Sequence, residues 1–135
     1  MITLTIPGEP VAKGRPRMMK SGIAFTPTKT RNYETLVKEL YIIENRDRPM
    51  LEGQLSASIY AHFTIPKSAS KKNREKMLEW EIRPTKRPDL DNIAKAVLDA
   101  LNGLAYQDDS QIVALEVCKY YSDKPRVIVE IREVR

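Results

Sequence analysis

The sequence predicts an α+β fold, in which a small mixed β-sheet packs against two or three helices. Three observations lead to this expectation. A chain of 135 residues is long enough for one hydrophobic core but not for two. Segments with period-two alternation occur near both ends and in the middle of the chain, with helically spaced segments between them. No repeat, linker or low-complexity tract divides the sequence, so residues 1–135 are expected to form a single domain.

The first third of the chain predicts a strand, a loop and a helix. Residues 2–6 alternate between apolar and polar side chains, which is typical of a strand. Residues 11–22 contain Gly and Pro among basic side chains and are expected to form a loop. A helix capped by Thr30 or Asn32 should follow and end near Asn45. Its apolar stripe consists of Tyr33, Leu36, Val37, Leu40 and Tyr41.

The middle of the chain predicts a strand followed by a basic helix. Residues 55–65 alternate throughout, so one face should be buried and the other wetter. A helix is expected over residues 70–81, with Met77 and Trp80 anchoring it. Its outward basic side chains would be Lys71, Lys72, Arg74 and Lys76. Two prolines, at positions 84 and 88, should then keep the chain extended.

The last third predicts one helix and two strands. The run N-I-A-K-A-V-L-D-A-L-N-G after Asp91 forms a helix that Gly103 closes as a C-cap. Its apolar face holds Ile93, Ala94, Val97, Leu98 and Leu101, and its polar face holds Asn92, Lys95, Asp99 and Asn102. Residues 112–121 and 126–134 read as strands, and the S-D-K-P turn between them suggests a hairpin.

Composition favours a cytoplasmic protein, and its charge fits both a nucleic-acid-binding protein and a basic protein without such a partner. No apolar run is long enough to span a membrane, and the N-terminus lacks the pattern of a signal peptide. The single cysteine, Cys118, excludes an internal disulfide and is expected to be a small buried residue. The net charge is +5, with the basic excess before residue 89 and an acidic excess after it. Basic surface attracts phosphate backbones.

An acidic motif stands out in this basic chain. In K-R-P-D-L-D-N, Asp89 and Asp91 are two residues apart, so in an extended segment their side chains emerge on one face. Asp108 and Asp109 follow in the loop beyond the next helix and could reach them if packing folds that loop back. Clustered carboxylates repel one another unless a cation such as Mg²⁺ lies among them. Lys95, one helical turn after Asp91, could address a phosphate.

Each of these features also has a simpler interpretation. Asp89 or Asp91 could cap the helix, and Asp108-Asp109 could serve a turn. The pair of Lys95 and Asp99 could be a surface ion pair. The lone His62 is expected to have a structural or solvent role. Trp80 and the tyrosines are expected in the core and at its rim, since their spacing shows no single-strand-binding pattern.

The long acidic block resolves these alternatives by resemblance. The stretch K-R-P-D-L-D-N-I-A-K-A-V-L-D-A-L-N-G-L-A-Y-Q-D-D-S-Q-I resembles the signature of the RusA family of Holliday-junction resolvases, small endonucleases found mostly in phages and prophages. P-V-A-K-G-R-P-R and F-T-P-T-K-T-R-N-Y-E, near the N-terminus, are similar to the opening of that family. About half of the residues are covered closely.

The resemblance implies an activity and a set of site residues. The activity is Mg²⁺-dependent hydrolysis of DNA at four-way junctions by paired symmetric nicks, in recombination and repair, with Mn²⁺ as a substitute metal. The family's metal-binding aspartates fall on Asp89, Asp91 and Asp109, with Asp108 as the alternative to Asp109, and its essential lysine falls on Lys95. Asp99 matches a recurrent family acid with a structural or supporting role.

Branched DNA and a second copy of the chain are the expected partners. Phosphate contacts would come from Lys13, Arg15, Arg17, Lys71, Lys72, Arg74 and Lys76. Symmetric nicking of a substrate with approximate two-fold symmetry is most simply performed by a C2 homodimer.

Two other functions fit the same residues. One is a Mg²⁺ nuclease that prefers flaps or other branches, and the other is a non-catalytic DNA-binding protein whose acidic loop a cation stabilises. A D-x-D sugar-nucleotide transferase is disfavoured, because no nucleotide-binding half precedes the motif.

Overall fold

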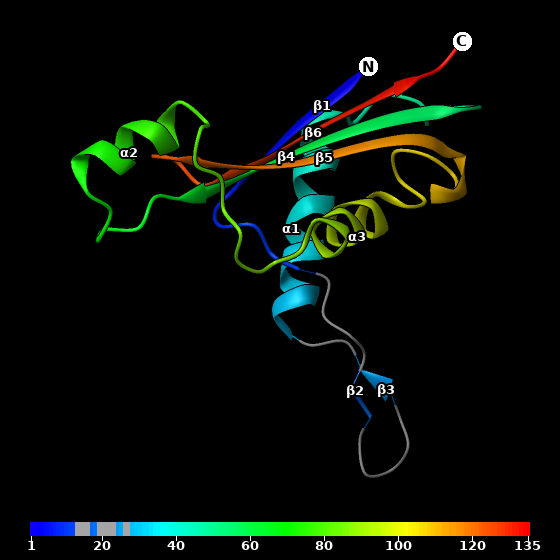
Figure 1. Cartoon of the computed structure of the whole chain (residues 1–135). Coiled ribbons are helices and arrows are strands. Elements are labelled where there is room, and N and C mark those ends of the chain that lie inside the picture. The colour runs from blue at the N-terminus through cyan, green and yellow to red at the C-terminus, as the bar shows by residue number, and fades with distance from the viewer. Residues whose placement is uncertain (13–16, 19–23, 26–27) are drawn as a thin grey trace.

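A four-stranded mixed sheet forms the centre of the fold, and helices α1 and α3 lie against one of its faces (Figure 1). The computed structural model describes residues 1–12, 17–18, 24–25 and 28–135. In chain order, the elements are β1 (Ile2–Pro7), β2 (Arg17–Met18), β3 (Ala24–Phe25), α1 (Thr28–Glu44), β4 (Leu55–Thr64), α2 (Lys71–Leu78), α3 (Leu90–Leu101), the 3₁₀ turn η1 (Asp109–Gln111), β5 (Ile112–Ser122) and β6 (Arg126–Glu133). The predicted α+β class is confirmed.

The strand order corrects one prediction. The order is β1-β6-β4-β5, in which β6 pairs antiparallel with both β1 and β4, while β4 and β5 are parallel. The two C-terminal strands are therefore not neighbours, and the predicted hairpin is wrong. Val127, Val129 and Ile131 are fully buried, because β6 sits at the centre of the sheet under the helices. β5 lies at the edge, where Val113 and Leu115 remain exposed.

Several predicted boundaries shift. The strands predicted at residues 2–6 and 55–65 are confirmed within one residue. Helix α1 ends close to the predicted Asn45 but begins at Thr28, before either predicted cap, since the added residues do not oppose a helix. The predicted loop 11–22 contains β2, which pairs with β3, and its other residues from position 13 onward lie outside the described part of the chain.

The basic helix is shorter than predicted. Ser70 caps α2 by accepting a hydrogen bond from the Asn73 backbone N–H, but the helix stops at Leu78. Met77 is buried as expected, whereas Trp80 lies beyond the helix with a φ of 68° and is 54% exposed. The prediction that Trp80 anchors the helix is therefore wrong, because the chain leaves the helical conformation before reaching it.

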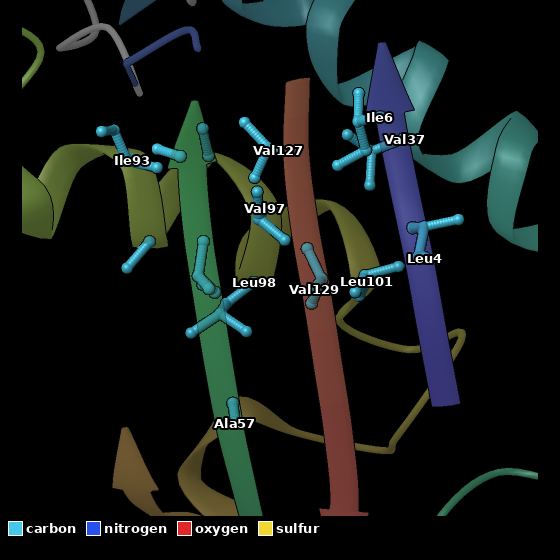
Figure 2. Close-up of a cluster of buried hydrophobic side chains, with 14 of the residues drawn as sticks. Leu4, Ile6, Val37, Ala57, Ile93, Val97, Leu98, Leu101, Val127 and Val129 are labelled. Atoms are coloured by element: carbon cyan, nitrogen blue, oxygen red, sulfur yellow. The ribbon is translucent and has the colours of Figure 1, made fainter. Parts of the chain in front are cut away.

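Helix α3 is the apolar element that positions the acidic motif. As predicted, its apolar side faces the sheet, and Gly103 follows its end with a φ of 81°. Figure 2 shows Val97, Leu98 and Leu101 directed toward β4 and β6, with Val37 of α1 next to Ile6 of β1 in the same core. Burying each such side chain contributes about 1.5–3 kcal/mol. This packing fixes the direction of α3 and thus where each of its ends lies. Among the described residues, no helix is long and apolar enough to cross a membrane.

The chain beyond α3 is held by a buried tyrosine. The Gly103 N–H donates to the Tyr106 carbonyl at 2.8 Å, which turns the chain back. The Tyr106 side chain is fully buried, and its hydroxyl donates to the Leu98 carbonyl at 2.6 Å. This bond ties the loop that carries Asp108 and Asp109 to the last turn of α3.

Replacing Tyr106 by phenylalanine is expected to lower the free energy of unfolding by about 1–2 kcal/mol, because the Leu98 carbonyl loses its hydroxyl partner. Tyr33→Phe is the matched control, since the Tyr33 hydroxyl is buried without a partner among the described residues. The control should be neutral or stabilising. Urea denaturation of both variants measures the difference, and equal stability of the two would contradict this account.

Candidate active site

Asp89 and Asp91 lie at the start of α3, and both are exposed. Asp89 is the N-cap residue, with φ −72° and ψ 157°, but its side chain makes no capping hydrogen bond. Its carboxylate is therefore not committed to the helix backbone, which removes the main support for the simpler interpretation of this residue as a cap. Asp91 follows in the first helical turn, where the helix dipole favours negative charge.

Lys95 and Asp99 continue the polar stripe that begins at Asp91. The three residues are spaced by four along α3, so each lies one turn beyond the last on one side of the helix. Lys95 is exposed and Asp99 is half-buried. The predicted polar face of this helix is confirmed, and it places the lysine next to the Asp89 and Asp91 end.

Asp108 and Asp109 differ in how their side chains are used. The Asp108 carboxylate accepts from the hydroxyl and the backbone N–H of Ser110 and forms a capping box with Gln111. Hydrogen bonds from Ser110, first from its side chain and then from its backbone, lower the pKa of Asp108. Asp108 therefore performs the turn chemistry that the simpler interpretation expects. Asp109 begins η1 and is exposed.

A second acidic group surrounds Tyr106. Burial raises the pKa of the Tyr106 hydroxyl, and the negative charges of Asp109, Asp99 and Asp108 raise it further, in that order. These three carboxylates therefore lie around the C-terminal end of α3. Sequence reasoning missed Tyr106, although a tyrosine two residues before an Asp-Asp pair at the end of an apolar helix was a signal for it.

The two acidic groups lie at opposite ends of α3. A helix of 12 residues is about 18 Å long, with Asp89 and Asp91 at its start and Asp109 beyond its end. β5 gives the same separation: Lys119, near its end, donates to the Lys86 carbonyl at 2.6 Å, while Asp109 just precedes its start at Ile112. Within the described ranges, no group of three His, Cys, Asp or Glu side chains is placed to hold a metal ion.

The structure describes only some of the Lys and Arg side chains that were predicted to contact DNA phosphates. Lys71, Lys72 and Arg74 are exposed on α2, and Arg74 pairs with Asp123. Lys76 is half-buried in the last turn of that helix. Lys13 and Arg15 lie outside the described residues, and Arg17 lies in β2 with its side chain undescribed.

The structure buries His62, which fits the structural role expected for it, and leaves Cys118 partly exposed. His62 is buried, although its face of β4 was expected to be wetter, because the Tyr120 ring stacks against it at 5.5 Å. Burial and then the charge of Arg126 lower the pKa of His62, so it is neutral at pH 7. The predicted burial of Cys118 is wrong: it is half-exposed, and its thiol contacts Glu116 at 3.4 Å. Neither residue contributes to the acidic groups.

Comparison with known proteins places this sequence in a class of DNA-cutting enzymes. Residues 7–132 match the family described as Endodeoxyribonuclease RusA. The chain belongs to the RusA family of endodeoxyribonucleases. It is 44% identical over 138 residues to the uncharacterized protein YqaN of Bacillus subtilis (strain 168), covering 98% of this chain and 96% of that protein. It is also 44% identical over 64 residues to the crossover junction endodeoxyribonuclease rusA of Lactococcus phage r1t, covering 47% of each.

Proposed function

We propose that this protein is a Mg²⁺-dependent endodeoxyribonuclease that resolves four-way DNA junctions by paired symmetric nicks, in recombination and repair. The observation that carries the proposal is the pair of exposed carboxylates of Asp89 and Asp91, which lie next to Lys95 in a chain of this family. The Asp89 carboxylate makes no capping hydrogen bond and is therefore available to a metal ion. The phage relative is named as a crossover junction endodeoxyribonuclease, which supports the choice of substrate.

The Asp89 and Asp91 pair suits Mg²⁺ better than a softer metal. Mg²⁺ is commonly held by only one or two carboxylates and completes its shell with water and substrate phosphate. Two exposed carboxylates at a helix start can supply the first ligands of such a site and leave coordination positions for a further carboxylate, water and phosphate. Bound there, Mg²⁺ or its substitute Mn²⁺ would polarise a phosphate and activate a water.

Lys95 has a role in binding the substrate and not in stabilising the fold. Its ammonium is exposed one turn from Asp91, where it can offset negative charge on the scissile phosphate or on the leaving oxygen. The exposed lysines of α2 bind more distant phosphates and position the DNA, which holds it without selecting a base sequence.

Asp109 is proposed as the third carboxylate, supplied by the second copy of a C2 homodimer. Asp108 is the weaker candidate because its carboxylate is already engaged by Ser110. Within one chain α3 separates Asp109 from Asp89 and Asp91, so only another copy could present it to that pair without remodelling the loop held by Tyr106. Two such shared sites would suit a substrate with two-fold symmetry.

Cleavage of a labelled synthetic four-way junction, beside a linear duplex of the same sequence, tests the activity. We expect paired nicks at symmetric positions near the crossover with Mg²⁺, none with EDTA, and little cutting of the duplex. Equal cutting of the junction and the duplex would indicate a general nuclease. Preferential cutting of a flap substrate, added to the same assay, would indicate a nuclease for other branched DNA. Tight binding of the junction without cutting would indicate a DNA-binding protein.

A further inference from the structure

The end of α2 places the chain's single tryptophan on the surface. The Glu81 N–H donates to the Lys76 carbonyl at 2.9 Å, and the Trp80 N–H donates to the Met77 carbonyl at 3.2 Å. This hydrogen-bond pattern closes a helix around one residue with positive φ, which is usually glycine. Here that residue is Trp80, whose φ is 68°. A large aromatic side chain thus occupies a position that disfavours it locally, and such outliers cluster at binding sites.

One side of Trp80 contacts a group of stacked rings. Its ring lies 4.4 Å from the ring of Tyr120, centre to centre, and Tyr120 in turn stacks on the buried His62. The Arg83 guanidinium lies 4.5 Å from the centre of the Tyr120 ring and is fixed by an N–H donated to the Lys119 carbonyl at 2.8 Å. Trp80 is nevertheless 54% exposed, so its position is fixed while much of its ring remains open to solvent.

The segment that follows Trp80 runs along the edge of β5 toward the acidic motif. Lys119 donates to the Lys86 carbonyl at 2.6 Å, so the chain after Arg83 is held along the edge of β5. Asp89 follows Lys86 by three residues and Arg83 by six, which limits its backbone distance from Arg83 to about 20 Å. Trp80 precedes Asp89 by nine residues, so the two backbones are at most about 30 Å apart, a distance that several nucleotides of a single DNA strand could span.

We propose that Trp80 is a stacking platform for an unpaired base of the DNA substrate, with Tyr120 and Arg83 holding it in place. The inference deepens the proposed nuclease function and rests on it for the choice of DNA. Aromatic rings bind bases of any sequence, because every base has a π-face, and neighbouring cations retain the backbone. Arg83 supplies such a cation beside the Tyr120 ring, and the choice of DNA over a protein as the occupant rests on the proposed nuclease function.

Intrinsic fluorescence tests the proposal directly, since Trp80 is the only tryptophan in the chain. The protein is titrated with a short oligodeoxythymidylate and, separately, with a blunt duplex, both without divalent metal. We expect the oligonucleotide to quench Trp80. Trp80→Leu should weaken oligonucleotide binding about tenfold, measured by anisotropy, and leave duplex binding within about twofold. Trp80→Phe should retain most of the affinity, because it keeps an aromatic face.

Leu78→Ala is the matched control, because Leu78 is 43% exposed two residues earlier and should leave binding unchanged. Unquenched fluorescence at saturating oligonucleotide, or equal oligonucleotide affinity in Trp80→Leu, would overturn the proposal. Binding is read without cleavage, so its result is separate from that of the junction assay. If Trp80 stacks on the oligonucleotide but the junction is not cut, the stacking proposal stands and the nuclease proposal is rejected. If the junction is cut but Trp80 does not stack, the nuclease proposal stands and the stacking proposal is rejected.

Discussion

Replacing Asp91 by asparagine is expected to lower junction cleavage by at least about a thousandfold while leaving junction binding nearly unchanged. The substitution keeps the size of the side chain and removes the charge that would hold Mg²⁺. Metal polarisation of a phosphate is worth several kcal/mol, and each 1.36 kcal/mol is tenfold in rate. Asp91 is exposed, so the fold should not suffer. Single-turnover cleavage and gel-shift binding of the same labelled junction measure the two effects.

Asp47→Asn is the control for Asp91→Asn, because it removes the same charge from an exposed residue in the turn after α1. It should cleave at the wild-type rate. If Asp91→Asn also cleaved at that rate, the acidic motif would be structural, and the proposed chemistry would be rejected. Loss of both binding and cleavage would instead point to a damaged fold, which the thermal unfolding curve of the variant would reveal.

Mixing two inactive variants is expected to restore cleavage if the active site is shared between copies. Asp91→Asn and Asp109→Asn are each expected to be inactive as homodimers. In a mixed dimer, one site combines both defects, and the other combines the intact Asp91 of one copy with the intact Asp109 of its partner. Random assembly makes about half of the dimers mixed, so about a quarter of wild-type sites should be restored. The product should be single nicks in place of paired ones.

The control for this mixture is Asp91→Asn combined with Asp89→Asn. These two residues lie at the same end of α3, so every site in a mixed dimer keeps one defect and no activity should return. Co-expression of differently tagged chains, followed by purification on both tags, isolates the mixed dimer for the nicking assay. Activity absent from the first mixed dimer would show that Asp109 is not supplied across the dimer.

Local sequence patterns were sufficient to predict most helices and strands, and the part of the site whose residues are close together in the sequence. The apolar stripe of α3 predicted its helix and its buried face, because a 3.6-residue period is visible within the 12 residues of this helix. Asp89, Asp91 and Lys95 are close in sequence, so their relation follows from the helix alone. Strand 55–65 was equally readable from its alternation.

Side-chain partners across the fold were beyond such patterns. Asp89 and Asp108 both occupy N-cap positions, yet only the Asp108 side chain makes capping hydrogen bonds, with Ser110 and Gln111. Trp80 had the helical spacing of an anchor, but α2 closed two residues before it and Tyr120 of β5 received its ring. In each case, the result depends on the local backbone conformation or on a neighbouring side chain. The periodic pattern of apolar residues encodes neither of these.

The amino-acid pattern was enough to assign this chain to the α+β class and to the RusA family of endodeoxyribonucleases, and to find an acidic motif at the start of one helix. The arrangement of the elements in space was visible only in the folded chain. The tertiary structure placed β6 between β1 and β4, and it set Asp109 at the far end of α3 from Asp91. The reason is physical: a helix or strand follows from neighbours in sequence, whereas strand order and the distance between two loops follow from which apolar faces pack together.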